Sequence, residues 1–464
     1  MHCFSFIRNM SVQVSALLCS LTVLVIPAQG QTVFENISFL VNDPDGLGEF
    51  GRSVAVDGNI IAVGAYGDNE NGTDSGAVYL FAVDTGVQLF KILPTDGDSF
   101  ERFGYSVAIQ GGILAVGAPH DPDSFGNNRG SAYIFDVTTG MQLNKFLPVP
   151  NNSQRDGFGN SVAVGNGIVA VGAPGDDSNI GGINSGSINL FDIKSGGRLG
   201  RVRADDRQPG DALGFSVALD GGLLVSGAPH DDDNGIESGS AYLFDVSTRA
   251  QIFKILPQAG GSVRDFFGYS VDIDDGRVVV GAFGDEDGGN GLDSGNIFVF
   301  DAATGNQVFR LSANDGSRED MFGFAVAIDN GIVAASSTGD DDNGDRSGSS
   351  YLFNATTGNQ IAKLLVSDGV NGERFGSAIA LSDGLVAVGA RFGISHGASN
   401  GSAYIFDFQC QADMNGDLAL NFFDISAFLS AFAAQDPIAD FTGDGTFNFF
   451  DISAFLSAFS AGCP

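Results

Sequence analysis

The sequence predicts a mainly β protein, a seven-bladed β-propeller closed by its N-terminal strand and followed by a small α-helical domain. Three observations lead to this prediction: a Phe-Gly block recurs seven times, a strand-like segment precedes the first copy, and the composition changes abruptly at Cys410. We therefore divide the 464 residues into a signal peptide (1–30), a propeller (31–408) and a C-terminal domain (409–464).

The repeated block reads FGRSVAVDGNIIAVGAYGD in its first copy, at residues 50–68. Similar blocks start 53 to 55 residues apart, at Phe50, Phe103, Phe158, Leu213, Phe267, Phe322 and Phe375. A period this regular over most of the chain indicates one supersecondary unit copied seven times.

Each unit is expected to form a four-stranded antiparallel meander. The Asp57-Gly58 pair lies between two β-favouring runs and is typical of a tight hairpin. In the first unit the four strands are expected at 53–56, 60–65, 76–81 and 87–93. Since no segment of this region has useful helical periodicity, a helical solenoid is excluded.

The two ends of the repeat region predict how the ring closes. The last unit ends with residues 403–408 and lacks a fourth strand, whereas residues 33–41 stand alone before the first Phe-Gly pair. We expect 33–41 to pair with 403–408 as the outer strand of the seventh blade, because this pairing removes two open sheet edges.

Three segments, 103–119, 158–174 and 213–229, run from Phe-Gly or Leu-Gly to Gly-Ala-Pro. They resemble the FG-GAP repeats of the integrin alpha-subunit propeller and of many bacterial surface proteins. The resemblance covers roughly residues 33–408 and implies an extracellular interaction or adhesion propeller.

The acidic loops differ from those of the integrin version, in which several blades carry a calcium loop between their first two strands. Here the corresponding link is a tight turn that is too short for such a loop. Acidic runs follow the second strand instead, at 231–234, 285–287 and 340–343. Because no ligand spacing recurs among them, we expect solvated surface loops, with weak calcium binding as the alternative.

Two twelve-residue segments of one pattern, 413–424 and 440–451, open the C-terminal domain. Calcium takes six or more oxygen ligands, which EF-hand-type loops supply from positions 1, 3, 5, 7, 9 and 12. The expected ligands of two calcium ions are Asp413, Asn415, Asp417, the Ala419 carbonyl, Asn421 and Asp424, and then Asp440, Thr442, Asp444, the Thr446 carbonyl, Asn448 and Asp451. The sixth position, which favours Gly, holds Leu418 in the first loop and Gly445 in the second.

The segment DISAFLSAF overlaps the end of each loop, at 424–432 and 451–459. Its apolar residues recur at i, i+3, i+4 and i+7, which makes one apolar helical face, and two such helices can pack face to face. Cys410 and Cys463 bracket the domain. In an oxidising compartment we expect them to form one disulfide, with two free thiols as the alternative.

The paired loop–helix pattern, with Asp at the twelfth position and a bracket from Cys410 to Gly462-Cys463, resembles the GC variant of type I dockerins. The resemblance covers roughly residues 410–464. It implies attachment to a cohesin-like or other extracellular scaffold protein.

In dockerins, loop positions ten and eleven take part in partner recognition. Aromatic residues occupy these positions here, Phe422 and Phe423 in the first loop and Phe449 and Phe450 in the second. We expect one ring of each pair to be buried in this small domain and the other to be exposed.

Charge and the N-terminal residues indicate partners and localisation. The net charge of −34, from 56 acidic and 22 basic residues, excludes nucleic acid as a favourable partner. Arg8, an apolar stretch at 12–26, and the small residues Ala28 and Gly30 are typical of a secretory signal peptide. We expect a secreted or cell-surface protein, since no later stretch is apolar for long enough to span a bilayer.

Two classes of function remain open. The mature chain has three histidines, His120, His230 and His396, and no GxSxG, HExxH or Walker-type pattern stands in a fitting context. We favour a secreted, non-enzymatic calcium-binding protein whose propeller binds a protein or glycan. The alternative is a glycoside-cleaving enzyme or accessory subunit delivered by the same tail. Two carboxylates about 5–10 Å apart in a cleft on one face would favour the enzyme.

Overall fold

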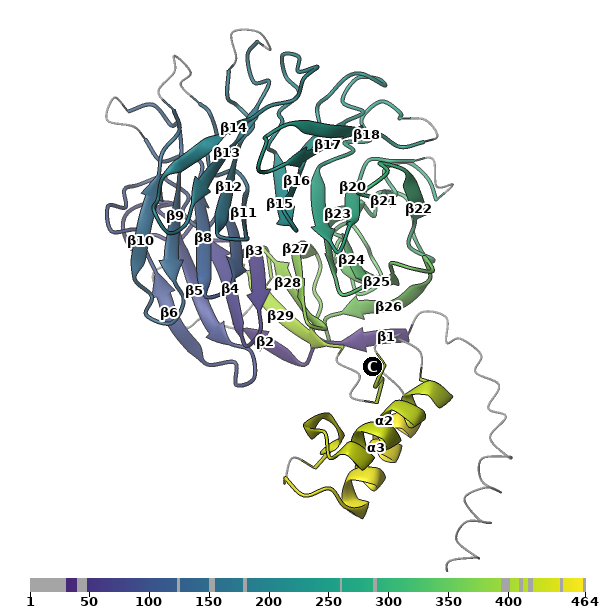
Figure 1. The fold of residues 1–464 in the computed structure, drawn as a ribbon. Helices are drawn as coiled ribbons and strands as arrows, with labels where there is room; N and C mark the ends of the chain where they lie inside the picture. Colours follow the sequence, from purple (N-terminus) through teal and green to yellow (C-terminus); the bar gives the residue numbers. More distant parts are fainter. Residues whose placement is uncertain are drawn as a thin grey trace, which may run out of the picture.

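The computed structural model describes residues 31–39, 48–122, 126–149, 155–177, 182–258, 261–286, 290–393, 401–408, 412–415, 420–442 and 445–461. The predicted signal peptide lies outside the described residues. Seven sheets stand around a central channel as the blades of a propeller, and two helices lie outside the ring (Figure 1). The predicted seven-bladed propeller is confirmed, and the helices fit the small helical domain expected after it.

The blades are built from antiparallel meanders in chain order. The first contains β3 (Phe50–Asp57), β4 (Ile60–Ala65), β5 (Ala77–Ala82) and β6 (Gln88–Ile92). The second contains β7 (Ser106–Gln110), β8 (Ile113–Ala118), β9 (Ser131–Asp136) and β10 (Gln142–Phe146). The third contains β11 (Val162–Gly165), β12 (Ile168–Ala173), β13 (Ser187–Asp192) and β14 (Arg198–Val202). The fourth contains β15 (Ser216–Asp220), β16 (Leu223–Ala228), β17 (Ser240–Asp245) and β18 (Gln251–Ile255).

The remaining blades follow the same order. The fifth contains β19 (Ser270–Asp274), β20 (Arg277–Ala282), β21 (Asn296–Asp301) and β22 (Gln307–Leu311). The sixth contains β23 (Phe322–Asp329), β24 (Ile332–Ser337), β25 (Ser349–Asn354) and β26 (Gln360–Leu365), and the seventh contains β27 (Phe375–Ser382), β28 (Leu385–Ala390) and β29 (Ser402–Asp407). Residues from the first strand of every blade surround the central cavity, so the fourth strands lie at the rim.

Two short strands precede the first blade, where we expected one strand at 33–41. β1 (Gln31–Phe34) pairs parallel with β26 of the sixth blade, and β2 (Ile37–Phe39) pairs antiparallel with β29 of the seventh. The carboxylate of Glu35 accepts hydrogen bonds from the amide and hydroxyl of Ser367 at 2.8 and 2.6 Å. The prediction of a single strand is therefore wrong, because the N-terminal segment divides its pairing between two blades; residues 40–41 lie outside the described part.

Glycines of the repeat stand where neighbouring blades touch. Gly51 has a φ of +84°, and a Cβ there would lie 2.1 Å from the carbonyl oxygen of Ser402 in the seventh blade. Gly389 faces back, since its Cβ would lie 2.0 Å from the Gly51 carbonyl oxygen. On the other side, the Ser53 hydroxyl donates to the carbonyl of Gly104 in the second blade at 2.8 Å. The repeated Gly residues therefore allow the blades to meet backbone to backbone.

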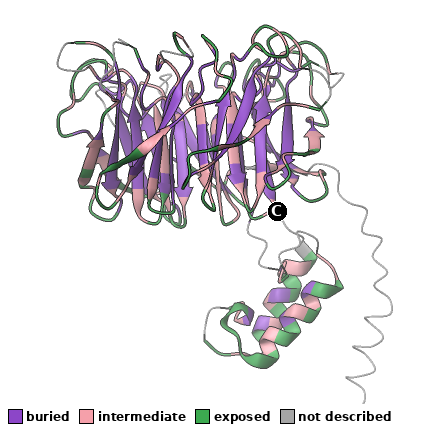
Figure 2. Ribbon diagram, turned by 45° about the horizontal axis from the view of Figure 1, so that its top comes forward, coloured by how far each residue is buried: buried purple, intermediate pink, exposed green. Residues whose placement is uncertain are grey.

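Aromatic rings fill the layers between blades. Phe50 contacts Tyr79 and Phe81 edge-on, with ring centroids 5.6 and 6.1 Å apart. The same buried cluster contains Ala403 and Ile405 of the seventh blade. Figure 2 shows the strands largely buried and many of the loops exposed. The propeller is therefore stabilised by inter-blade layers, in which each blade covers the face of the next.

The C-terminal domain contains the helices α2 (Phe422–Ala434) and α3 (Phe449–Ala461) and the 3-10 turn η2 (Pro437–Ala439). Phe428 and Phe455 are buried between the helices, as expected. Leu429 and Leu456, which the apolar pattern places on the same packed face, are 52% and 50% exposed. The buried stripe is therefore narrower than predicted. Among the described residues, no helix has both the length and the apolar character needed to cross a membrane.

Candidate functional site

One face of the ring carries the acidic loops. Phe50 pairs with Ala65, so the start of β3 and the end of β4 lie at the same end of the first blade. The other blades have the same strand order. We call this side the Phe-Gly face. It holds the loops between second and third strands and the loops that follow the fourth strands.

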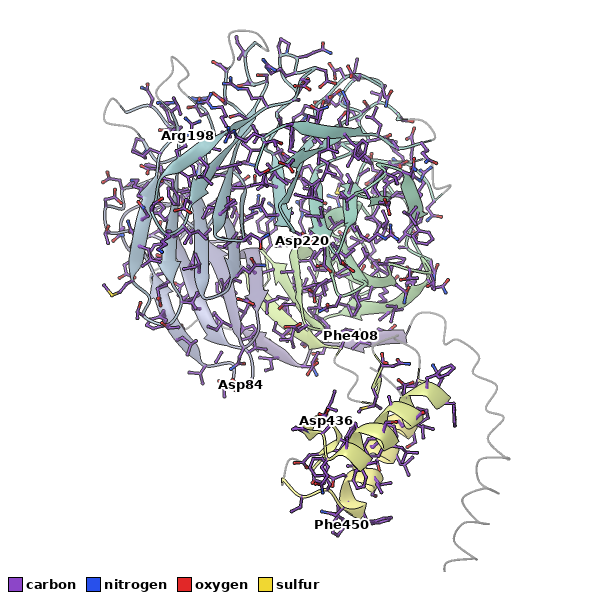
Figure 3. All side chains as sticks on the ribbon, viewed as in Figure 1. Asp84, Arg198, Asp220, Phe408, Asp436 and Phe450 are labelled. Carbon is purple, nitrogen blue, oxygen red and sulfur yellow. The ribbon has the colours of Figure 1, made fainter. Side chains whose placement is uncertain are left out.

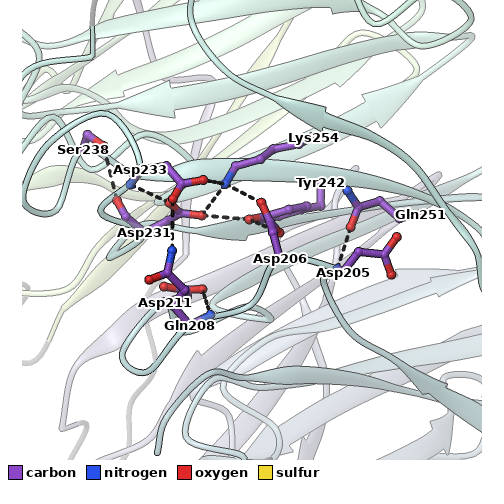
Figure 4. Close-up of polar contacts among 10 residues, drawn as sticks. All are labelled: Asp205, Asp206, Gln208, Asp211, Asp231, Asp233, Ser238, Tyr242, Gln251 and Lys254. Atoms are coloured by element: carbon purple, nitrogen blue, oxygen red, sulfur yellow. Dashed lines mark hydrogen bonds and ion pairs between the residues drawn. The ribbon is translucent and has the colours of Figure 1, made fainter. Parts of the chain in front are cut away.

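Asp231 is the centre of a buried polar cluster in the fourth blade (Figure 4). Its carboxylate accepts hydrogen bonds from the Tyr242 hydroxyl at 2.8 Å and from Lys254 Nζ at 2.9 Å. Asp206, in the loop after the third blade, lies 2.8 Å from the same ammonium group and links the two blades. Burial acts to raise the pKa of Asp231, but hydrogen bonds from the Asp233 amide, Lys254 and Tyr242 outweigh it and hold the pKa below its ordinary value.

The cluster recurs around the ring. Equivalent groups are Asp68, Tyr79 and Lys91 in the first blade, Asp121, Tyr133 and Lys145 in the second, and Asp340, Tyr351 and Lys363 in the sixth. Arginine replaces the lysine in the third and fifth blades, where Arg201 pairs with Asp176 and Arg310 pairs with Asp285.

Our prediction that the acidic runs are solvated loops is wrong for the first carboxylate of each run. Asp231, Asp285 and Asp340 are 2–3% exposed, whereas Asp232 and Asp341 are exposed. A recurring spacing does exist. In the fourth and sixth blades the bonded Tyr lies 11 residues after the Asp, and the bonded Lys lies 23 residues after the same Asp. Comparing the third and fourth strands of all copies would have revealed it.

A second buried carboxylate faces the cluster in several blades. Asp211 accepts a hydrogen bond from the Gln208 amide, but its burial and the charge of Asp231 raise its pKa to about 6. Burial likewise raises the pKa of Asp320 to about 6 and that of Glu101 to about 8. Because these groups recur and each accepts a bond from a nearby backbone amide, they do not form one asymmetric acid–base pair.

The channel opens at the Phe-Gly face in a cavity of 240 Å³. The residue after each Phe-Gly or Leu-Gly pair lines it, and this position varies from blade to blade. In blade order these residues are Arg52, Tyr105, Asn160, Phe215, Tyr269, Phe324 and Ser377. Seven equivalent positions therefore produce an asymmetric mouth, which the sequence analysis did not identify.

The first predicted calcium loop precedes α2. Asp424 is fully buried and accepts hydrogen bonds from the backbone amides of Asn421 and Asn415, at 2.8 and 3.4 Å. The carboxylate at position twelve thus turns back toward positions nine and three. Asp413 is partly buried, and Asp417 and the Ala419 carbonyl lie outside the described residues.

The second loop precedes α3 and has more of its ligands described. Asp451 is fully buried and accepts a hydrogen bond from the Thr442 hydroxyl at 2.8 Å, and Asp440 lies 3.4 Å from the same hydroxyl. The amides of Asn448 and Thr442 lower the pKa of Asp451, together with the Thr442 hydroxyl. Gly445, at position six, has a φ of +74° and donates its amide to Asp440 at 2.7 Å. Positions one, three and twelve therefore converge.

The convergent oxygen atoms fit a hard cation such as calcium. Asn448 donates its side-chain NH2 group to the Thr446 carbonyl at 3.0 Å, and its Oδ1, the predicted ligand atom, accepts a hydrogen bond from the Phe450 amide at 2.7 Å at the start of α3. Asp444 lies outside the described residues, as do Cys410 and Cys463 of the predicted disulfide. Within the described residues, no group of three or more His, Cys, Asp or Glu side chains comes together in a way that could hold a metal ion.

All four aromatic rings at loop positions ten and eleven are exposed, by 63% for Phe422, 68% for Phe423, 72% for Phe449 and 69% for Phe450. Figure 3 labels Phe450 at the end of the helical tail. Our expectation that one ring of each pair is buried is wrong. The rings belong to the first turn of each helix, and Phe428, Phe441 and Phe455 already fill the small core.

The FG-GAP repeat family matches seven segments, at residues 39–81, 87–135, 141–191, 198–244, 250–300, 306–353 and 359–406. Each segment includes the outer strand of one blade and the first three strands of the next, and the first segment starts at Phe39 in β2. No curated protein matches the chain. Because the seven segments span well over half of its residues, the chain belongs to the FG-GAP repeat family.

Proposed function

We propose that the protein is a secreted, non-enzymatic binding protein. Its propeller binds a protein or glycan, and residues 409–464 form a dockerin-like, calcium-binding anchor for a cohesin-like or other extracellular scaffold protein. Membership of the FG-GAP family supports an interaction role for the propeller. The predicted signal peptide, 1–30, and the predicted Cys410–Cys463 disulfide belong to the same proposal, since both suit an extracellular protein.

The exposed Phe pairs carry the proposal for the tail. Phe422 and Leu429 are seven residues apart in α2, so they share one face of the helix, and both are at least half exposed. Phe449 and Leu456 repeat this arrangement in α3. Two equivalent ridges of exposed apolar side chains in so small a domain favour a docking role.

Calcium would be held by the carboxylates and amide oxygens of the two loops, with Asp424 and Asp451 as the buried ligands. When bound, it would neutralise the carboxylates that converge in each loop. Asp424 and Asp451 also accept amide hydrogen bonds at the first turns of α2 and α3. The order of the loops is therefore coupled to the orientation of the Phe pairs, which begin these helices.

The propeller itself favours binding over glycoside cleavage. The buried carboxylates of its Phe-Gly face recur from blade to blade and are bonded to Lys, Arg or Tyr side chains or to backbone amides. No carboxylate is present among the described residues that line the cavity at the channel mouth. We further propose that pairing of β2 with β29 closes the ring and holds this mouth in shape.

The test uses the full mature chain. Calorimetric titration should find two calcium sites, and capture of a partner from the native extracellular fraction should require calcium. The double variant Asp424→Ala, Asp451→Ala should lose calcium binding and partner capture. Asp436→Ala, which changes an exposed acid outside the loops, should leave calcium binding and capture unchanged.

A further variant separates metal binding from docking. Phe422→Ala with Phe423→Ala should reduce capture at least tenfold and leave calcium binding intact. Capture that persists in chelator would contradict the calcium-dependent anchor.

A further inference from the structure

Four arginines lie on blades seven, one and two, and Arg52 among them lines the cavity at the channel mouth. The Cζ atoms of Arg52 and Arg102 lie 4.4 and 5.3 Å from the ring centroids of Tyr105 and Tyr66. Those of Arg374 and Arg391 lie 5.6 and 4.8 Å from the single ring of Phe392. Among the described residues, none of the four arginines forms an ion pair with a carboxylate. They therefore form a positively charged wall in a protein whose net charge is −34.

The backbone brings two of these arginines together. A Cβ on Gly51, which precedes Arg52, would lie 3.0 Å from the amide nitrogen of Ala390, which precedes Arg391. Burial lowers the pKa of Arg391, and the charges of Arg52 and Arg374 lower it further, against the opposing charge of Glu49. The Nε atom of Arg391 is buried and has no hydrogen-bond partner among the described residues. An anion bound by Arg52 in the mouth would reduce the repulsion between Arg52 and Arg391.

Aromatic rings from blades four to six form the other wall. The centroid of Tyr269 lies 4.9 Å from that of Phe215, 4.7 Å from that of Phe283 and 5.1 Å from that of Phe324. All four rings are partly exposed. Tyr269 and Arg52, both in the lining of the cavity, also interact electrostatically. The mouth therefore presents the rings of Phe215, Tyr269 and Phe324 together with the guanidinium group of Arg52.

We propose that this mouth binds an anionic sugar. Arg52, which lines the cavity, binds its carboxylate or sulfate, Arg391 beside Arg52 adds positive charge, and Tyr269 and Phe324 stack on the C–H face of its ring. An acidic side chain of a peptide lacks such a flat face. The 240 Å³ cavity is at the small end of ligand pockets, which span roughly 300–1,000 Å³, so it accepts a single sugar unit of a glycan. This inference rests on the proposed binding role of the propeller and names its ligand.

The test measures binding of the full mature protein to matched ligands by calorimetry. The ligands are trigalacturonate, its neutral methyl ester, a chondroitin sulfate tetrasaccharide and triglutamate. At least one anionic sugar should bind, more weakly at high salt, and the ester and triglutamate should bind at least tenfold more weakly. Arg52→Ala with Arg391→Ala, and separately Phe324→Leu, should each weaken sugar binding by about tenfold. Arg318→Ala, an exposed arginine outside the mouth, is the control.

The outcomes separate this inference from the proposed function. Unchanged melting curves show that the variants fold. Failure of both anionic sugars to bind at millimolar concentration, or equal binding of the methyl ester, would overturn the inference. A different contrary outcome is that triglutamate binds more tightly than the sugars and loses its binding in the Arg52→Ala, Arg391→Ala variant. That result would contradict a sugar as the ligand and would still support the propeller as a binding module. Calcium-dependent capture through the tail is measured separately with the Asp424→Ala, Asp451→Ala protein, which should retain sugar binding.

Discussion

The rings of Phe428 in α2 and Phe455 in α3 stack with their centroids 4.0 Å apart and their planes 1° from parallel. Each ring is 1% exposed, and Phe441 contacts both edge-on, at 5.5 and 5.4 Å. Three rings thus form the centre of the tail's core. Because the domain has few other buried residues, the packing of the two helices depends on them.

Phe428→Ala should unfold the helical tail and leave the propeller folded. Truncating a buried Phe costs about 3–5 kcal/mol, a large share of the stability of so small a domain. Hydrogen exchange of α2 and α3 in the full chain should become fast, while the melting of the propeller stays unchanged. Leu429→Ala, at a half-exposed position, is the control. Equal effects of the two variants would contradict the stacked core.

Phe39→Ala should destabilise the propeller through the pairing of its ends. Phe39 is 1% exposed in β2, and its ring lies 5.0 Å from that of Phe81 in the first blade. Its loss removes buried contacts worth about 3–5 kcal/mol and weakens the outer strand of the seventh blade. Chemical denaturation should show a loss of this size, with Ser38→Ala, at an exposed position of β2, near the parent. A protein that lacks residues 31–39 and melts like the full chain would sink the proposed closure.

Lys363→Met should be strongly destabilising. Its ammonium group lies 2.8 Å from Asp315, 3.0 Å from Asp340 and 2.6 Å from Asp342, and the residue is 5% exposed. Removing one partner of a buried ion pair leaves an uncompensated charge at a cost of about 3–5 kcal/mol. Lys194→Met changes an exposed lysine and should have little effect.

A second change tests whether the uncompensated charge is the cause. Asp340→Asn in the Lys363→Met background should recover part of the lost stability, because it removes the charge left in the interior. The contrary outcome is additivity. If Asp340→Asn lowers the free energy of unfolding by the same amount in the Lys363→Met background as in the parent protein, the two side chains are not coupled.

Glu101→Gln should stabilise the propeller above neutral pH. Glu101 is 1% exposed, and burial, with the nearby charge of Asp121, raises its pKa to about 8. Because its unfolded pKa is about 4.3, its favourable contribution is complete below that pH and is lost as pH rises toward 8. The gain in melting temperature on substitution should therefore grow between pH 5 and pH 8.5.

Asp136→Asn is the matched control for this pH dependence. Hydrogen bonds from the Thr138 hydroxyl and the Thr139 amide lower the pKa of Asp136, so its titration lies below this pH range. Its effect on the melting temperature should be the same at pH 5 and pH 8.5. A gain for Glu101→Gln that is equally independent of pH would show that Glu101 does not titrate in this range.

The helices and the repeat could be read from local pattern, but the N-terminal segment could not. The segments 424–432 and 451–459 lie within α2 and α3 because i, i+3, i+4 and i+7 spacing is a local property. Residues 33–41 have strand composition, but Glu35 and Asn36 lead the chain from one blade to the next. The choice of two partner strands depends on residues more than 300 positions away along the chain.

The candidate sites likewise contain features that local spacing predicts and features that depend on tertiary packing. The spacing of the two loops predicted that Asp424 and Asp451 turn toward residues of their own loops, since all partners lie within twelve residues. The exposure of the Phe pairs was predicted wrongly, because it depends on which rings reach the space between α2 and α3. That space is filled by Phe428, Phe441 and Phe455, and pattern alone does not assign it.

By itself, the sequence determined the number of blades, the hairpins within each blade and the position of the helical tail, because each follows from periodicity and turn chemistry over short distances. Only the tertiary structure decided that Asp231 and its equivalents are buried against Tyr and Lys, and that Arg52 and Tyr269 line one channel mouth with Arg391 beside Arg52. The physical reason is the geometry of the ring. Closing seven repeats places equivalent positions of distant copies around one axis, so different residues at one repeat position become neighbours and form a single asymmetric site.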